Sequence, residues 1–367
     1  MALKFVFFPE YPTIKYMYIL GIETSCDETA ASVIKVNPRS GRLLVLSNII
    51  SSQISIHQKY GGVVPEIAAR EHVLNILPVI DEALAEAKID FHHLEAIGVT
   101  KGPGLITSLI TGVETVRTLA FAWNKPIIEV NHIEGHIYSN FINPASPIKF
   151  PAIILTVSGG HTILLSMEKS GKIKILGETR DDAAGEAFDK ASKMMDLGYP
   201  GGPIISRYAA QYRQASKANE KLKSDPINLP RPMINSKDFD FSFSGLKTAL
   251  LYQLQNDPSW QKRIPEYCHE LQQAIIDILI SKTIKAAVKL QARTVMLSGG
   301  VSANEELRTQ MSIAVTSKLP HVNFLMPARE YTTDNAAMIA AAAAHRLLAG
   351  QTIPYQQSRV NPGLQLK

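Results

Sequence analysis

Apolar and polar positions follow the same pattern in two distant stretches of the chain, residues 18–36 and residues 152–167. In each, an apolar run of strand length leads into a turn of small and polar residues and then into a second apolar run. Such a pair of runs is typical of a β-hairpin. A third apolar run, at 294–297, leads into two glycines and a helical pattern at 305–318. The two similar hairpins predict an internally duplicated fold.

Helical periodicity marks three further segments, residues 65–87, 107–123 and 271–290. In the first of them apolar residues recur close to every 3.6 positions, which is typical of an amphipathic helix. Strands that alternate with helices favour the α/β class, with mixed sheets covered by helices. The alanine-rich run 336–344 is too short to span a bilayer, which takes roughly 20 residues, and it predicts a buried helix.

The length of 367 residues exceeds what one compact core usually holds, so we expect two lobes. Residues 1–16 are expected to lie outside the fold, either because Met17 is the natural start or because they form an N-terminal arm. The expected units are lobe I from residues 17–128 with about 331–350, lobe II from 129–330, and a C-terminal tail at 351–367.

Composition and charge add a compartment and a candidate surface. The chain is 46% apolar and 19% charged, as a soluble enzyme is, and its two cysteines cannot form a disulfide framework. We therefore expect a cytoplasmic protein without membrane contact. Residues 207–248 hold eight basic residues against four acidic ones, within a net charge of +5. This basic insertion in lobe II, with a surface excursion at 215–242, is either a phosphate-binding surface or a solvated helical face.

Two turns rich in glycine and hydroxyl groups are candidates for phosphate binding, Ser158-Gly159-Gly160 and Ser298-Gly299-Gly300. A phosphate needs several backbone N–H donors at close range, and glycine permits this because it has no Cβ. The second turn also precedes a predicted helix, whose N-terminus attracts anions. A plain β-turn is the alternative for each. The P-loop lysine motif and the Gly-x-Gly-x-x-Gly motif are absent from the sequence.

His132 and His136 stand four residues apart, so on a helix both imidazoles would share a face and could hold one metal ion. A surface or core pair is the alternative. Glu134 would point roughly 200° away from His132 at about 100° per residue, so the zinc-protease arrangement does not form. A third ligand must come from elsewhere. Asp334 stands at a predicted helix start, where a plain N-cap is the alternative role.

Acidic residues gather at two further places. Asp182, Glu186 and Asp189 would share a helix face, either as solvated charges or as acceptors for ribose hydroxyls. Asp27 and Glu28 stand in the first hairpin turn, where a simple turn pair is the alternative. Beside a phosphate their charge would need a metal or an amine to offset it. With a nucleotide site present, these two residues are candidates for catalytic electrostatics.

Taken in order, these motifs resemble the tRNA N6-adenosine threonylcarbamoyltransferase family, and more its bacterial members than its archaeal ones. The resemblance runs from Met17 to about residue 345. It rests on the segments GIETSCDETA (21–30), YGGVVPEIAAREH (60–72), GPGL (102–105), NHIEGH (131–136), VSGGHT (157–162), DDAAGEAFDK (181–190), YPGGP (199–203), DFSFSGLKT (240–248), SGGVSAN (298–304) and TDNAAMIA (333–340).

The resemblance implies the duplicated two-lobe fold of actin, sugar kinases and Hsp70 ATPases, the ASKHA fold. It implies transfer of a threonylcarbamoyl group from threonylcarbamoyl-AMP to N6 of adenosine 37 in tRNAs that read codons beginning with A. It implies one divalent metal ion per subunit, iron(II) first and zinc as the alternative, on His132, His136 and Asp334. It implies adenylate contacts at Thr156, Val157, Ser158, Gly159, Gly160, Asp189, Gly202 and Asn304.

The same resemblance implies contact with the tRNA anticodon loop, for which residues 207–248 are the candidate surface. It also implies a TsaB-like paralogue and a TsaE-like ATPase as partners. Two other functions stay open. A small-molecule kinase of the same fold would need a catalytic aspartate, and no motif singles one out. A non-catalytic nucleotide-binding scaffold would be expected to lack metal ligands, whereas all three candidates are present.

Overall fold

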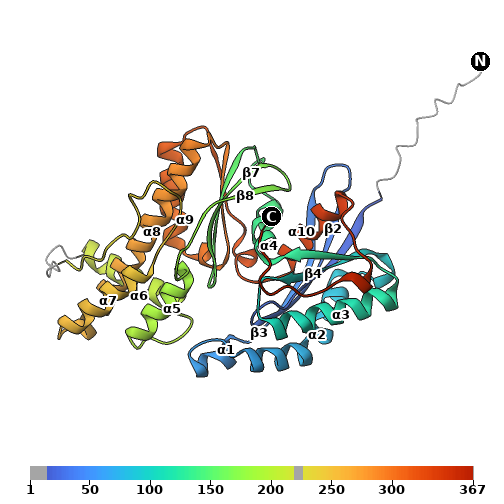
Figure 1. Cartoon of the computed structure of the whole chain (residues 1–367), viewed down its shortest axis with the longest axis horizontal. Helices are drawn as coiled ribbons and strands as arrows, with labels where there is room; N and C mark the ends of the chain where they lie inside the picture. Colours follow the sequence, from blue (N-terminus) through green and yellow to red (C-terminus); the bar gives the residue numbers. More distant parts are fainter. Residues whose placement is uncertain (1–14, 219–225, 367) are drawn as a thin grey trace, which may run out of the picture.

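The computed structural model describes residues 15–218 and 226–366, which form two lobes side by side (Figure 1). Each lobe is built on a mixed sheet of five strands within these residues. The sheet of lobe I contains β1 (Met17–Glu23), β2 (Glu28–Val36), β3 (Leu43–Ser52), β4 (Leu94–Gly102) and β5 (Ile127–Asn131). The sheet of lobe II contains β6 (Ala152–Val157), β7 (Thr162–Lys169), β8 (Lys172–Glu178), β9 (Thr294–Ser298) and β10 (Asn323–Leu325).

The two sheets have the same topology. In the order β3-β2-β1-β4-β5, β1 and β2 pair antiparallel, as do β2 and β3, whereas β4 and β5 run parallel to β1. The second sheet, written β8-β7-β6-β9-β10, repeats this order and these directions strand for strand. The predicted α/β class and internal duplication are therefore confirmed.

Helices cover both faces of the first sheet. On one face lie α2 (Pro65–Ala87), which follows the short α1 (Ile54–His57), and α3 (Ile106–Trp123). On the other face lies α10 (Ala336–Leu348), whose alanine run is fully buried, as predicted. A Cβ added to Gly21 of β1 would stand 2.5 Å from the carbonyl oxygen of Ala336. The absence of that Cβ lets α10 lie directly on the strands.

The second sheet is covered by more helices, seen at the left of Figure 1. A large apolar cluster joins one of its faces to α5 (Ala184–Met194), α6 (Gly201–Ala218), α7 (Ser244–Asn256), α8 (Ile264–Lys289) and α9 (Glu305–Lys318). The other face packs on Ile133 and Ile137 of α4 (His132–Tyr138). Helices α4 and α10 contact each other between the two sheets. Residues next to these two helices are therefore placed where the lobes meet.

The segment expected as a surface excursion, 215–242, contributes to the core in its described part. Leu229, Phe239 and Phe241 are buried in the lobe II cluster. Phenylalanine at every second position from 239 to 243 is an alternating pattern that predicts a buried extended segment. The expected excursion over 226–242 lies mostly at the surface, but these three side chains anchor it in the lobe II core and bury apolar area.

The basic residues of 207–248 are partly neutralised within lobe II. Arg213 pairs with Glu306 at 2.9 Å, Arg231 with Asp277 at 3.0 Å and with Glu270, and Lys247 with Asp182 at 2.9 Å. The side chain of Lys217, and Lys221 and Lys223 entirely, lie outside the described residues.

Both described ends of the chain contact lobe I, and the C-terminal end also contacts lobe II. Strand β5 runs past the expected lobe boundary at residue 128. In the C-terminal segment, Ile353 forms a β-bridge with Ile127, and Leu366 packs on the apolar cluster of α4. At the other end Lys15 pairs with Glu95 at 3.3 Å, while residues 1–14 of the expected N-terminal arm lie outside the described residues. Among the described residues no helix is both long and apolar enough to cross a membrane.

Candidate active site

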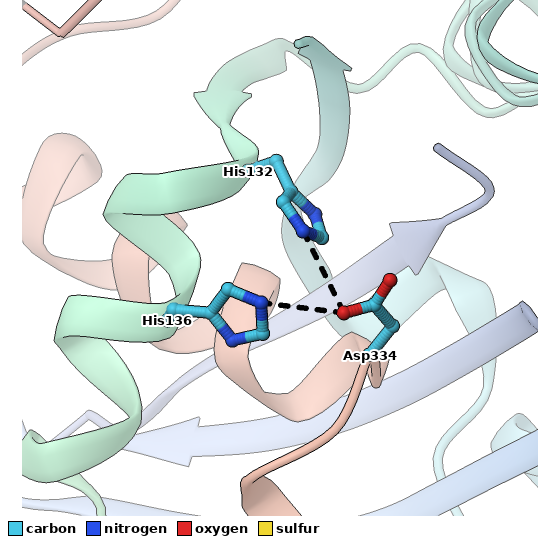
Figure 2. A group of neighbouring side chains, drawn as sticks. All are labelled: His132, His136 and Asp334. Carbon is cyan, nitrogen blue, oxygen red and sulfur yellow. Dashed lines mark ion pairs between the residues drawn. The ribbon is translucent and has the colours of Figure 1, made fainter. Parts of the chain in front are cut away.

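Two helix caps place the candidate metal ligands. The Asn131 side chain accepts hydrogen bonds from the N–H groups of Ile133 (2.8 Å) and Glu134 (3.4 Å), so α4 begins at His132. At α10 the cap is Asn335, whose side chain accepts from the N–H of Met338 at 3.0 Å. The alternative role of Asp334 as an N-cap is therefore taken by its neighbour. The Asp334 carboxylate points to His132 and His136 of α4 instead (Figure 2).

His132, His136 and Asp334 converge on one point. Asp334 Oδ1 lies 3.5 Å from His132 Nε2 and 3.2 Å from His136 Nε2 (Figure 2). One ligand atom from each residue lies within 4.8 Å of the others. Among the described residues, Nδ1 of the buried His136 has no hydrogen-bond partner, and its Nε2 has only the ion-pair contact with Asp334 Oδ1. Burying polar atoms that lack full hydrogen bonding costs free energy, and a cation bound at Nε2 would offset part of that cost.

Glu23, at the end of β1, orients His132 from the other side of its ring. His132 Nδ1 lies 3.0 Å from Glu23 Oε2 and 3.1 Å from Ser25 Oγ. The Glu23 carboxylate in turn accepts hydrogen bonds from Thr100 Oγ1 at 2.7 Å and from the N–H of Ser25 at 2.5 Å. A carboxylate on the far nitrogen is the usual support of a metal-bound histidine, because it fixes the tautomer and the ring orientation. Sequence reasoning missed this role, although Glu23 stands within the segment 21–30.

The charges at the site favour a cation. Burial lowers the pKa of His132, but the carboxylates of Asp334 and Glu23 outweigh it and raise this pKa to about 9. Burial lowers the pKa of His136. Two imidazole nitrogens and one carboxylate oxygen are a donor set suited to zinc and to iron(II). The residues present therefore fit a divalent metal ion.

Glu134 lies away from this site. Its carboxylate pairs with Arg346, with Oε1 3.1 Å from Nε and Oε2 2.7 Å from Nη2. The predicted direction of this side chain is confirmed. The glutamate is held by a guanidinium of α10 and cannot act as the base of a zinc protease.

The acidic turn between β1 and β2 lies beside the metal site. Burial, then the carboxylates of Asp27 and Asp334, raise the pKa of Glu28 well above its ordinary range. Burial and the charges of Asp27 and Asp189 also raise the pKa of Tyr199, which belongs to lobe II. Groups of lobe I and lobe II therefore lie close enough to affect one another electrostatically at this turn. Tyr199 opens the segment YPGGP (199–203).

The first glycine turn, at 158–161, closes by a hydrogen bond from the Ser158 N–H to the His161 carbonyl at 2.8 Å. Gly159 and Gly160 are exposed, and a Cβ on either would meet no atom within 4 Å. Burial, then His132 and His136, lower the pKa of His161 to about 4. The turn thus opens to solvent next to the metal site, with room for a ligand at its backbone.

Strand β6 leads into this turn and is fixed to β9 beside it. Thr156 and Val157 are buried, and Thr156 Oγ1 lies 2.9 Å from Ser298 Oγ of β9. Gly299 has φ +84°, and a Cβ there would stand 2.4 Å from the Val157 carbonyl oxygen. The second glycine turn is therefore shaped by its contact with the first.

The sequence predicted that the second glycine turn leads directly into a helix. The structure differs. A 3-10 turn at Gly300–Ala303 separates the glycine turn from α9, whose cap is Asn304. Asn304 Oδ1 accepts from the Leu307 N–H at 3.0 Å, and its Nδ2 donates to Ser206 Oγ and Gln272 Oε1, both at 2.9 Å. Both Nδ2 protons are therefore used within the fold, and an adenylate contact by this side chain would use the second lone pair of Oδ1 or replace one of the Nδ2 bonds.

The acids of 181–190 serve the fold of lobe II. Asp182 pairs with Lys190 at 2.6 Å and with Lys247 at 2.9 Å, and Glu186 pairs with Lys190 at 2.8 Å. Asp189 Oδ1 accepts from the N–H of Gly201 at 2.7 Å, so it holds the first turn of α6.

Gly202 follows in that turn, and a Cβ there would meet no atom within 4 Å. Gly202 therefore leaves room for a ligand beside its Cα, and Asp189 already accepts backbone hydrogen bonds from this turn.

Comparison with known proteins shows the family of this chain. A family model described as TsaD, tRNA N6-adenosine threonylcarbamoyltransferase, matches residues 44–341. The chain belongs to this family. A tRNA N6-adenosine threonylcarbamoyltransferase of Syntrophomonas wolfei is 48% identical over 324 residues, 88% of this chain and 90% of the relative. One from Geobacillus thermodenitrificans is 44% identical over 358 residues, 95% and 97% of the two chains.

A solved structure, HypF of T. kodakarensis, has a TM-score of 0.54 at 13% identity and covers 93% of this chain and 48% of its own. At that identity it supports the fold alone. With the family model and the two matching sheets, the predicted TsaD family, its acyltransferase class and its ASKHA fold are confirmed. The three candidate ligands thus stand in an enzyme of a tRNA-modifying family.

Proposed function

We propose that this chain transfers the threonylcarbamoyl group of threonylcarbamoyl-AMP to N6 of adenosine 37 in tRNAs that read codons beginning with A. The observation that carries the proposal is the meeting of His132, His136 and Asp334 beside an exposed glycine turn, in a member of the TsaD family. A candidate cation site and an exposed glycine turn in one place suit an adenylate donor.

The chemistry asks mainly for positioning. The donor is a mixed anhydride with a good leaving group, and the adenine amine is a weak nucleophile, so correct placement supplies much of the rate. A divalent ion on His132, His136 and Asp334, iron(II) first and zinc as the alternative, would supply a Lewis acid for the donor carbonyl. Glu23 keeps the Nε2 atom of His132 available for such an ion.

The other residues act on the phosphate and the proton. Backbone N–H groups of Gly159 and Gly160 bind the AMP phosphate and stabilise the negative charge that grows there as AMP leaves. A bond forms between N6 and the carbamoyl carbon, the bond from that carbon to the phosphate oxygen breaks, and N6 loses a proton. Asp27 or Glu28 takes up this proton; burial and the charge of Asp27 raise the pKa of Glu28 and so favour a proton there.

The tRNA and the partner proteins need surfaces outside the site. Nucleotide 37 lies in an unpaired loop, so its base can be splayed out into the site. We propose the basic stretch 207–248 as the tRNA contact, in the cytoplasm. We propose that a TsaB-like paralogue docks on α2 and α3, where apolar residues are exposed, and that a TsaE-like ATPase joins them. The exposed apolar residues are Val73, Leu74, Leu77, Ile106 and Ile110.

A reconstituted reaction tests the transfer. The purified chain is mixed with tRNA, threonine, bicarbonate, ATP and an adenylate-forming synthase, with and without the partner proteins, and the modified nucleoside is measured after tRNA digestion. We expect modified adenosine with the wild type and at least a hundredfold less with His132→Ala, in keeping with the cost of losing placement at a reacting group. Normal transfer by metal-free His132→Ala would contradict the metal's role. Phosphorylation of sugars or carboxylic acids from ATP, without tRNA modification, would favour the kinase instead.

A further inference from the structure

His72 of α2 reaches the acidic turn from inside lobe I. Its Nε2 lies 3.0 Å from the carbonyl oxygen of Cys26, and its Nδ1 lies 2.8 Å from Thr29 Oγ1. A carbonyl oxygen only accepts, so Nε2 carries the proton and Nδ1 accepts from the Thr29 hydroxyl. Burial lowers the pKa of His72, which favours this neutral form. The imidazole therefore joins both ends of the turn that holds Asp27 and Glu28.

Other groups hold the same turn from outside the hairpin. Ser108 of α3 donates its hydroxyl to the Cys26 carbonyl at 3.2 Å. The Ser25 carbonyl accepts a hydrogen bond from the N–H of Leu105 at 2.8 Å. The Asp27 carbonyl accepts one from the N–H of Gln53 at 3.2 Å. Three successive carbonyls are thus each fixed by lobe I. The direction of the acidic side chains depends on these contacts.

His72 is chemically out of place for a core residue. The other buried residues of α2 are apolar, namely Ala68, Ile76, Val79, Ile80 and Ala83. A leucine would fill the same position without the cost of burying two polar nitrogens. That cost is offset by the two hydrogen bonds to the turn. The imidazole is therefore explained by what it holds and not by packing.

We propose that His72 is a positioning residue for the transfer reaction: by fixing the Cys26 carbonyl it directs Asp27 and Glu28 to the reacting groups. This inference rests on the proposed function. It assigns a role to the segment 60–72, which the metal and glycine sites leave without one. His72 touches none of the three metal ligands through any hydrogen bond found among the described residues.

Two substitutions at this position separate positioning from packing. His72→Leu keeps the volume and removes both hydrogen bonds. His72→Gln keeps one acceptor and one donor at a spacing close to that of the ring nitrogens. We expect His72→Leu to lower kcat in the reconstituted transfer roughly 10- to 100-fold, the cost of a small misplacement, with KM for tRNA and metal content unchanged. We expect His72→Gln to recover most of the lost rate.

A second pair of variants covers the case in which His72→Leu does not fold. Thr29→Val removes the hydroxyl that donates to His72 and should lower kcat in the same direction with unchanged KM. Thr283→Val is the matched control, because Thr283 is a buried threonine of α8 whose hydroxyl binds the Leu279 carbonyl at 2.7 Å. It should leave kcat unchanged. Equal losses in both threonine variants would overturn the proposal.

Hydrogen exchange tests whether His72 holds the turn, independently of any activity assay. Peptides covering residues 25–29 should exchange faster in His72→Leu than in the wild type, whereas His72→Gln should match the wild type. Unchanged exchange, or an unchanged kcat in a folded His72→Leu, would overturn the inference. Absence of transfer by the wild type would count against the proposed function instead, and the exchange data would still decide whether His72 holds the turn.

Discussion

At the scale of single residues, spacing along one helix predicts part of the site. His132 and His136 were visible as a pair because their geometry depends only on α4. Asp334 and Glu23 reach opposite nitrogens of His132 from distant parts of the chain, so only tertiary packing brings them there. Spacing alone could not distinguish a metal-ligand role for Asp334 from an N-cap role. The motif that contains Glu23 did not reveal that this residue supports His132. Asn304 shows the opposite case, since its amide is used within the fold.

Replacing Glu23 by glutamine tests its support of His132. The change removes the negative charge beside Nδ1 and should weaken metal affinity roughly 10- to 100-fold, as loss of such outer partners does. Competition with a chelator of known affinity measures this. Glu129→Gln is the matched control, because this carboxylate of β5 pairs with Lys101 at 2.6 Å and does not contact the site. Equal affinities in the wild type and Glu23→Gln would refute the role given to Glu23.

At the scale of elements, helices with strong periodicity were predicted well and their junctions less so. Residues 65–87 and 305–318 form helices at the expected bounds. The 3-10 turn before α9 was not predicted, because it depends on the contact between Gly299 and Val157. The burial of Phe239 and Phe241 was missed because charged and proline residues around them dominated the interpretation.

Gly21→Ala tests the close packing of α10 on β1. The new Cβ would stand 2.5 Å from the Ala336 carbonyl oxygen, so strand or helix must shift. We expect the free energy of unfolding to fall by about 1–3 kcal/mol, as for other overpacked cores. Denaturant unfolding measures it, with Gly363→Ala as control, since a Cβ at that position meets no atom within 4 Å. A stability equal to that of the wild type would show that α10 has room to move.

At the scale of the whole molecule, duplication explains where the site is. Two sheets of one topology each present a hairpin turn, and α4 and α10 bring the ligands together between them. The hairpin pattern predicted this duplication because each strand pair is local in sequence. The expected boundary at residue 128 was set inside β5, because the first sheet continues directly into α4.

The central claim is that His132, His136 and Asp334 hold one divalent cation between the lobes. Anomalous diffraction from crystals of the metal-containing protein, collected at the absorption edge of the metal present, tests this most directly. The account predicts one strong peak bonded to Nε2 of both histidines and to the Asp334 carboxylate, at roughly 2.0–2.2 Å from each. The crystals must contain stoichiometric metal. A peak at other residues, with no metal bonded to His132, His136 and Asp334, would contradict the account.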